Sequence, residues 1–528
     1  MKSKDVWTIP LAVAALLLIF AGALSYTQRV RVRGELSTLL PEMPVAVLRV
    51  PALRERLPHL LQSAPYQQLR QAAVWQELLA PLTESLHDLN VDPMRVIGAD
   101  ALVSLHQRPD SGGIPAVLVL SRMDWLAKTA EQIAYVFDCF FGKIGIRVAQ
   151  SGGADAIYQI QTEQMRFPIY YATLDDVALL CTSLPLLKQT VARAIHGGEP
   201  VIAPLPPSET RIASLVAQPL AAAHALAPNP FFALDEQRLQ PMLPNGWLAL
   251  SLDALPEQIV LNVALSPEDS LNAPTNLRKR GQRGLSPEEK SLAASGELSR
   301  ARVRRFMDNL NGMLPELRLA FSAPEFAPLQ AIAGDRIVWR LLKDVQGTLY
   351  AAPDLACAFE IRTPPQTALS VMQQFVARLI ERHLPPAQRT VITPLPEPYR
   401  GSVITKMTML FQEIFCYAVV SGQDASEGIF AATSKTMKRE IDRRSGAAAT
   451  KSPDFPAFAV MIQSAQLADF LNQLARTNTF QLLVPKHRNA PFYEAVPTLL
   501  GWLNALPPMR IDGDADGRGV WLSGTLGR

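Results

Sequence analysis

The sequence lacks the short motifs that mark many catalytic, phosphate-binding and metal sites. It has no G-x-S-x-G nucleophile elbow, no G-x-x-x-x-G-K phosphate loop and no C-x-x-C pair. The histidines show neither H-x-H nor H-x-x-x-H spacing, which excludes a zinc pair on one strand or helix. We therefore predict no catalytic, cofactor-binding or metal-binding residue, and we expect each histidine at the surface or at a helix end. The histidines are His59, His87, His106, His196, His224, His383 and His487.

The chain also lacks a strong charge of either sign and contains little cysteine. Its 51 Lys and Arg residues and 48 Asp and Glu residues leave a formal charge of +3, so composition gives no argument for a nucleic-acid partner. All four cysteines lie in apolar segments, which favours buried free thiols, and disulfides are the alternative in an oxidising compartment. These cysteines are Cys139, Cys181, Cys357 and Cys416.

One long uncharged run is present, at Val6–Tyr26. At 1.5 Å per residue, about 20 apolar residues cross a hydrocarbon core of about 30 Å. Trp7 and Tyr26 lie at its two ends, as interfacial aromatic residues do. The run predicts a retained N-terminal transmembrane helix. A cleaved signal peptide, with Ala21–Ala23 as an A-x-A site, is the main alternative, and a buried globular helix is the other.

The flanking charges do not decide the orientation of this run. Basic residues flank both of its ends, at Lys2 and Lys4 and at Arg29, Arg31 and Arg33. Because a very short tail before a signal-like segment usually stays inside, we expect an inner-membrane, single-pass protein whose bulk is periplasmic. A cytoplasmic body is the alternative. The three arginines are predicted to form a juxtamembrane tether.

A strand followed by an amphipathic helix recurs along the chain. The strands are predicted at 45–50, 116–121, 357–362 and 458–463. After the second, apolar residues recur every three or four positions from Asp124 onward, which predicts a helix. Pro364 and Pro365 fit the start of the helix after the third strand, and Ser464 is predicted as the N-cap after the fourth.

A second block also recurs, in which an apolar strand runs into Thr-Ser and then a helix. It occupies 175–194 and 427–444, with Thr182-Ser183 and Thr433-Ser434 at the junctions. These residues are candidate nucleophiles, but their position favours N-capping. Each block follows a hairpin-like stretch, 157–174 or 402–420, and a closing strand pair begins near Gly246 in one half and Met509 in the other.

These patterns predict an α+β fold: an N-terminal transmembrane helix followed by two diverged copies of a mixed or antiparallel sheet unit with helices packed on one face. The expected division is 1–40 as anchor and tether, 41–268 as the first repeat domain, 269–304 as a charged linker and 305–528 as the second repeat domain.

Two polar segments carry weaker hints of binding. Asp512–Gly517 fits the D-x-D-x-D-G pattern of a calcium loop, but the twelfth position is Ser523 and not Glu, which favours a hairpin turn rich in Asp and Gly. The cluster of Arg278, Lys279, Arg280 and Arg283 has the charge to contact phosphates or lipid head groups. Because no aromatic residue lies among these four, a solvated linker is preferred.

Four segments, LPEMPVAVLRVPALRERL, PAVLVLSRMDWLAKTAEQI, VALLCTSLPLLKQTV and VWLSGTLG, carry a family resemblance. On these segments the chain resembles uncharacterised bacterial membrane-anchored envelope proteins that are classed as domains of unknown function. The resemblance implies an anchored, exported protein and supplies no catalytic residue.

Three functions are compatible with the sequence. We expect a non-enzymatic binding or scaffold protein, held in the membrane by its N-terminal run, that presents sheet edges or grooves to another envelope component. A hydrolase-type enzyme with a site assembled from distant residues is the first alternative. A binder of lipid or another apolar ligand is the second.

Overall fold

The computed structural model describes two compact units, and the division between them does not follow the chain in a simple order. The first unit comprises Met1–Leu61, Ala80–Ala254 and Leu265–Asn276, and the second comprises Gln62–Leu79, Leu255–Ala264 and Leu277–Arg528. The described residues are 35–41, 44–71, 100–107, 116–123, 157–160, 168–174, 176–196, 208–226, 243–267, 292–314, 326–346, 352–383, 385–409, 412–421, 426–446, 456–477, 490–517 and 519–527.

The sheet of the first unit is antiparallel at every described pairing, in the order β4-β5-β6-β3-β2-β1-β7-β8. One face packs on η1 and α7, where Leu118, Leu120 and Leu187 are fully buried. The elements are η1 (Leu36–Leu39), β1 (Pro44–Pro51), α2 (Leu53–Gln62), β2 (Asp100–His106), β3 (Ala116–Arg122), β4 (Tyr158–Ile160), β5 (Ile169–Leu174), β6 (Val177–Cys181), α7 (Leu184–His196), β7 (Arg211–Ala217), α8 (Pro219–Leu226) and β8 (Trp247–Leu255).

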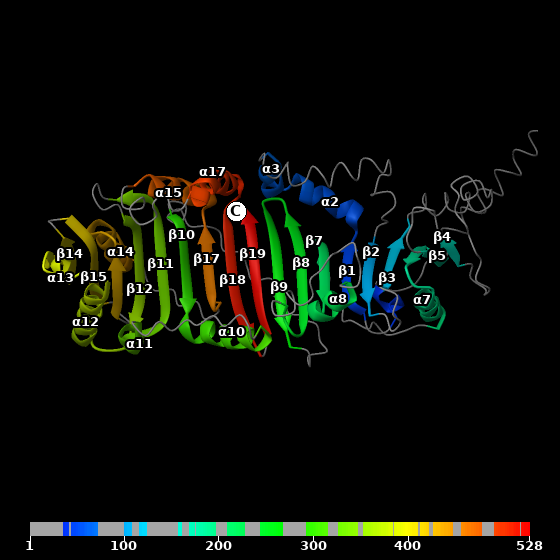
Figure 1. The fold of residues 1–528 in the computed structure, drawn as a ribbon, viewed down its shortest axis with the longest axis horizontal. Coiled ribbons are helices and arrows are strands. Elements are labelled where there is room, and N and C mark those ends of the chain that lie inside the picture. The colour runs from blue at the N-terminus through cyan, green and yellow to red at the C-terminus, as the bar shows by residue number, and fades with distance from the viewer. Residues whose placement is uncertain are drawn as a thin grey trace, which may run out of the picture. The chain divides into compact units, whose positions relative to one another are not determined.

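The sheet of the second unit is also antiparallel and runs in the order β13-β14-β15-β16-β12-β11-β10-β17-β18-β19, followed by β9 (Figure 1). From β14 to β18 this order matches that of the first unit from β4 to β8.

The elements of this unit are α3 (Ala64–Gln71), β9 (Gln258–Ser266), β10 (Leu292–Ser299), α10 (Arg300–Met313), α11 (Ala327–Ile332), β11 (Ala333–Gln346), β12 (Ala352–Ile361), α12 (Pro365–His383), α13 (Pro386–Arg389), β13 (Ile392–Tyr399), β14 (Ser402–Met409), β15 (Gln412–Ser421), β16 (Ser426–Ala431), α14 (Ser434–Gly446), β17 (Phe458–Ile462), α15 (Ser464–Arg476), α17 (Ala490–Ala505), β18 (Met509–Asp516) and β19 (Gly519–Gly527).

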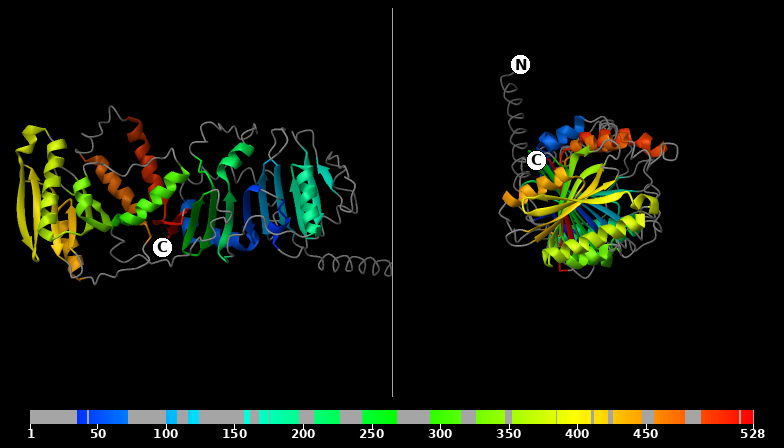
Figure 2. Two further views of the ribbon diagram at one scale, coloured as in Figure 1. Left: turned by 90° about the horizontal axis from the view of Figure 1, so that it is seen from below. Right: turned by 90° about the vertical axis from the view of Figure 1, so that its left-hand side faces the viewer.

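Helices cover both faces of the second sheet (Figure 2). Tyr417 on β15 packs with Phe375 of α12 in one apolar cluster. Its neighbour Cys416 packs with Met437 and Ile441 of α14 in another. Because successive side chains of a strand point to opposite faces, α12 and α14 lie on opposite sides of the same strands.

The expected fold class is therefore wrong. The described strand pairings are antiparallel, which is one of the two expected arrangements, but the sheets are large and the second carries helices on two faces and not one. The reason is visible in β15, where consecutive residues from Phe415 to Val420 are apolar and supply a core on each side. Among the described residues no helix combines the length and apolar character needed to cross a membrane. Of the expected anchor and tether, 1–40, residues 1–34 lie outside the described residues, whereas Leu36, Leu39 and Leu40 are buried in the core of the first unit.

Several local expectations can be compared with the structure. The two predicted hairpins are confirmed as β4–β5 and β14–β15, and α12 begins at Pro365 as expected. The segment 269–304 contains β10 and the start of α10, so it is not only a linker. Ser464 does not cap α15: it is the first helical residue, and its hydroxyl donates to the Pro507 carbonyl at 3.0 Å. The predicted helix after Asp124 and the Arg278–Arg283 cluster lie outside the described residues.

Candidate functional site

The outermost hairpin of the second sheet, β13–β14, is the candidate binding edge. Its two strands are joined by Arg400 and Gly401, whose φ angles are +46° and +77°. Positive φ at both positions of a two-residue loop is the type I′ geometry, which fits the twist of a hairpin. Pairing then continues without a register shift from Tyr399–Ser402 to Ile392–Met409.

Three prolines determine what the free edge of β13 can bind. Pro394, Pro396 and Pro398 alternate along the strand, and within the described part of the chain β13 pairs with β14 alone. In a two-residue hairpin the closing pair, here Tyr399 and Ser402, is hydrogen-bonded. The next pair is not, and the two kinds of pair then alternate along the strands. The prolines occupy the pairs that are not hydrogen-bonded, where the backbone nitrogen faces away from β14. The free edge therefore lacks N–H donors at three sites and resists the addition of another strand.

Apolar side chains are exposed around the same hairpin. Leu395 is 46% exposed, Val403 47% and Val391 38%, and the three prolines are also exposed. Leu395 pairs with Lys406, which pairs with Cys416 on the α14 side, so Leu395 points to that side. Val403, an odd number of residues from Lys406, lies on the α12 side opposite Pro398. The edge thus presents apolar side chains on both of its flanks.

Ionic contacts hold the hairpin to α14. The Glu397 carboxylate lies between Lys438 of α14, at 2.5 Å, and Lys406 of β14, at 3.2 Å. The hydrogen bond from Lys438, together with Lys406, holds the pKa of Glu397 below its usual value. The Tyr399 hydroxyl donates to Asp442 of α14 at 2.8 Å. These contacts fix the hairpin without using its exposed apolar side chains.

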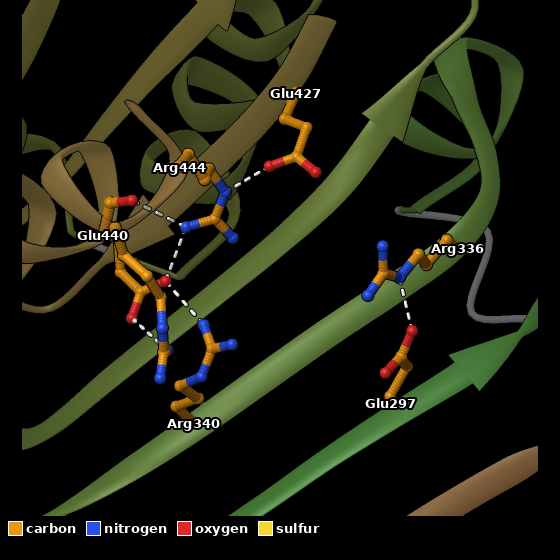
Figure 3. A network of polar contacts seen from close by, with 7 residues as sticks. Glu297, Arg336, Arg340, Glu427, Glu440 and Arg444 are labelled. Carbon is orange, nitrogen blue, oxygen red and sulfur yellow. Dashed lines mark hydrogen bonds and ion pairs between the residues drawn. The ribbon is translucent and has the colours of Figure 1, made fainter. Parts of the chain in front are cut away.

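A buried ion network in turn fixes α14 to the sheet (Figure 3). Glu440 accepts from Arg340 of β11 and from Arg444, each at 2.6 Å, and Arg444 also pairs with Glu427 of β16. The Glu440 side chain is only 9% exposed. Burial alone would lower the pKa of Arg444, but the two carboxylates outweigh it and the net shift is upward. The network is therefore a charged structural joint between α14 and two strands.

The Thr-Ser junctions differ between the two halves. Thr433 is confirmed as an N-cap, because its hydroxyl oxygen accepts from the Thr436 N–H at 3.2 Å at the start of α14. The Ser434 hydroxyl, the other candidate at this junction, donates to the Glu413 carboxylate of β15 at 3.0 Å. At the other junction the Thr182 hydroxyl oxygen accepts from the Val117 N–H of the neighbouring strand β3, at 2.9 Å, and capping of α7 by Thr182-Ser183 stays a prediction.

The Asp-rich segment lies in β18 and the turn after it. Gly517 has φ +52° at that turn, Arg510 pairs with Asp512 at 2.9 Å, and Arg302 of α10 lies 3.5 Å from Asp514. Two of the three aspartates are thus engaged by arginines. Among the described residues no group of three or more His, Cys, Asp or Glu side chains is arranged to hold a metal ion.

Three of the four cysteines lie within the described residues. Cys181, Cys357 and Cys416 are all free thiols, with Cys181 and Cys416 buried as expected and Cys357 half-buried. Burial raises the pKa of Cys181 to about 11 and raises that of Cys416 further. Cys139 is outside the described part of the chain.

No protein-family model matches the chain. No curated protein matches it either. Three solved structures, crystal forms I, III and IV of TP0453, resemble part of it at 8%, 9% and 10% sequence identity. They cover 45%, 49% and 44% of this chain and 80%, 85% and 80% of theirs, with TM-scores of 0.25, 0.26 and 0.26. At such TM-scores the likeness supports no argument about fold or function.

Proposed function

We propose that the protein is a non-enzymatic binding or scaffold protein of the bacterial envelope. In this proposal the apolar run Val6–Tyr26 anchors the chain in the inner membrane, the body lies in the periplasm, and the β13–β14 hairpin contacts another envelope protein. The observation that carries the proposal is the exposure of Leu395 and Val403 beside a proline-blocked edge.

The contact is made by side chains and not by strand addition. Leu395 and Val403 expose nearly half of their surface, and protein interfaces bury such apolar anchors at their centre behind a polar rim. Glu397, Lys406 and Arg400 lie next to these anchors and supply charged groups for such a rim. Because the prolines remove donors from the edge, affinity from a β-strand partner is small by comparison.

Site-specific photo-crosslinking in cells tests this contact. A photoreactive residue is placed at Leu395 or at Val403, and the matched control is Gln374, an exposed polar position on α12. We expect one discrete cross-linked protein from the two hairpin positions and none from Gln374. When the photoreactive residue is at Val403, the additional substitution Leu395→Asp should abolish its adduct. Adducts that are absent at both hairpin positions, or equal at all three, would refute the proposed contact.

The orientation is tested separately with a reporter fused after Arg528. We expect a signal from a reporter that works only in the periplasm. We expect no signal from a reporter that works only in the cytoplasm. The reverse result would place the body in the cytoplasm and overturn the proposed localisation.

A further inference from the structure

Helices α10 and α12 lie on the same face of the second sheet. Phe306 of α10 packs edge-to-face on Phe458 of β17, with ring centroids 5.3 Å apart. Phe458 is paired with Leu298 of β10, which is paired with Ile337 of β11. Paired residues point to the same side, and Ile337 packs in the cluster that contains α12. Figure 1 shows both helices along the lower margin of this sheet.

The outer surfaces of these two helices carry exposed arginines. Arg304 and Arg305 of α10 and Arg378 of α12 are exposed, and none forms an ion pair within the described residues. The exposed acidic residues on the two helices are Asp308 and Glu381. We name Arg304, Arg305 and Arg378 the arginine face.

On the opposite face of the same sheet, most basic residues of the covering helix form ion pairs. Helix α14 is also rich in Lys and Arg, but Lys438, Arg443 and Arg444 are paired with carboxylates of the sheet or of the helix itself. Lys435 and Arg439 are its exposed basic residues. Three of the five basic residues of α14 are therefore paired within the fold, whereas Arg304, Arg305 and Arg378 are exposed and form no ion pair among the described residues.

We infer that the arginine face contacts an anionic lipid surface, with the guanidinium groups on lipid phosphates. Arg304 and Arg305 lie on one helix and Arg378 on another, with α11 packed beside α12, so the three do not converge on one small anion. A planar anionic surface can engage side chains that are spread over one side of a sheet. Guanidinium groups suit phosphate oxygens because they donate two parallel hydrogen bonds. The inference rests on the proposed membrane anchor, which would keep the body near lipid.

Arginine-specific footprinting provides the test. The complete chain is reconstituted into nanodiscs of phosphatidylcholine, with or without phosphatidylglycerol, and labelled with phenylglyoxal, and each arginine is quantified by mass spectrometry. A basic residue near an anionic bilayer gains about fivefold in binding. We therefore expect labelling of Arg304, Arg305 and Arg378 to slow by about fivefold in the anionic discs. Arg439, on the α14 side, is the internal control and should label equally in both. Equal labelling of the arginine face in both discs would overturn the inference.

A pair of charge-matched variants separates surface contact from net charge. Arg304→Gln with Arg305→Gln should weaken the protection of Arg378, whereas Lys435→Gln with Arg439→Gln should leave it unchanged. If both variants weaken the protection of Arg378 equally, the protection comes from net charge and the proposed contact is refuted. Failure of the chain to enter the discs refutes the anchor alone. The same footprint is then measured with anionic vesicles added to the free chain, where protection of the three arginines supports the inference and its absence overturns it.

Discussion

Removal of the Glu440 charge should destabilise α14 more than any other single neutralisation on that helix. Glu440 is nearly buried and accepts charge-assisted hydrogen bonds from Arg340 and Arg444. Glu440→Gln keeps the size of the side chain but removes the negative charge that balances the positive charges of both arginines. Loss of one member of a buried ion network costs about 3–5 kcal/mol. Arg444 keeps Glu427 as a partner, so we expect a value at the lower end, about 3 kcal/mol.

Amide hydrogen exchange of α14 peptides is the assay, because it reports the stability of this segment without assuming that the whole chain unfolds in one step. A loss of about 3 kcal/mol corresponds to exchange about 100-fold faster for amides that open with the helix. The matched control is Glu381→Gln on α12, an exposed carboxylate whose neutralisation should change stability by less than about 0.5 kcal/mol. If Glu440→Gln changes exchange no more than Glu381→Gln does, the network is not a structural joint.

Of three further predictions, two concern other parts of the second unit and one concerns a thiol of the first. Gly513→Ala should destabilise by about 1–3 kcal/mol, because its Cβ would lie 2.3 Å from the Phe458 ring, whereas Gly501→Ala, with open space in α17, should be neutral or stabilising in the same thermal melt. Cys181, with a pKa of about 11, should resist iodoacetamide at pH 8 until the protein is denatured; rapid labelling in the native state would contradict its burial. Burial raises the pKa of Asp335, but hydrogen bonds from Ser299 and the Ala301 N–H, together with Arg362 and Arg300, outweigh it, so its contribution is present at neutral pH and lost as pH falls below about 4. The destabilisation caused by Asp335→Ala, about 1 kcal/mol at pH 7, should therefore vanish in acid denaturation curves.

Local signals in the sequence predicted local structure well. The start of α12 at Pro365 follows from the fixed φ of proline, and the cap at Thr433 follows from its place between a strand and a helix. The β14–β15 hairpin follows from apolar residues that alternate in β14 and from the short polar break before the apolar run of β15. Each of these features depends on residues that are neighbours in the chain.

Features that depend on tertiary context were missed. A strand with three prolines is disfavoured by propensity, and β13 exists because it lies at an edge where the missing donors do no harm. Its signal was the alternation of Pro394, Pro396 and Pro398 just before the Arg400-Gly401 turn. β10, LAASGELS, is composed mostly of small or polar residues and follows a charged stretch, so its pattern did not indicate a strand. It is nevertheless paired on both sides, with β11 and β17.

The ion network that holds α14 behind the candidate edge could not be inferred from spacing. Arg340, Glu427, Glu440 and Arg444 come from two strands and a helix, and only Glu440 and Arg444 are near in sequence. Ion networks between elements have no fixed sequence interval, unlike a pair at i and i+4 within one helix. The helices on both sides of β15 were missed for a related reason. A continuous apolar run shows that a strand is buried but does not show what buries each side.

The most direct test of the account is whether the complete chain is held in a membrane by Val6–Tyr26. Membranes from cells that express it are washed with alkaline carbonate and then with detergent. We predict that the chain stays in the carbonate pellet and is released by detergent. Leu17→Arg with Leu18→Arg, each unfavourable by about 2.5–3.5 kcal/mol at a bilayer centre, should move it to the carbonate supernatant. An unaltered chain found in that supernatant would contradict the proposal of a membrane-anchored binding protein.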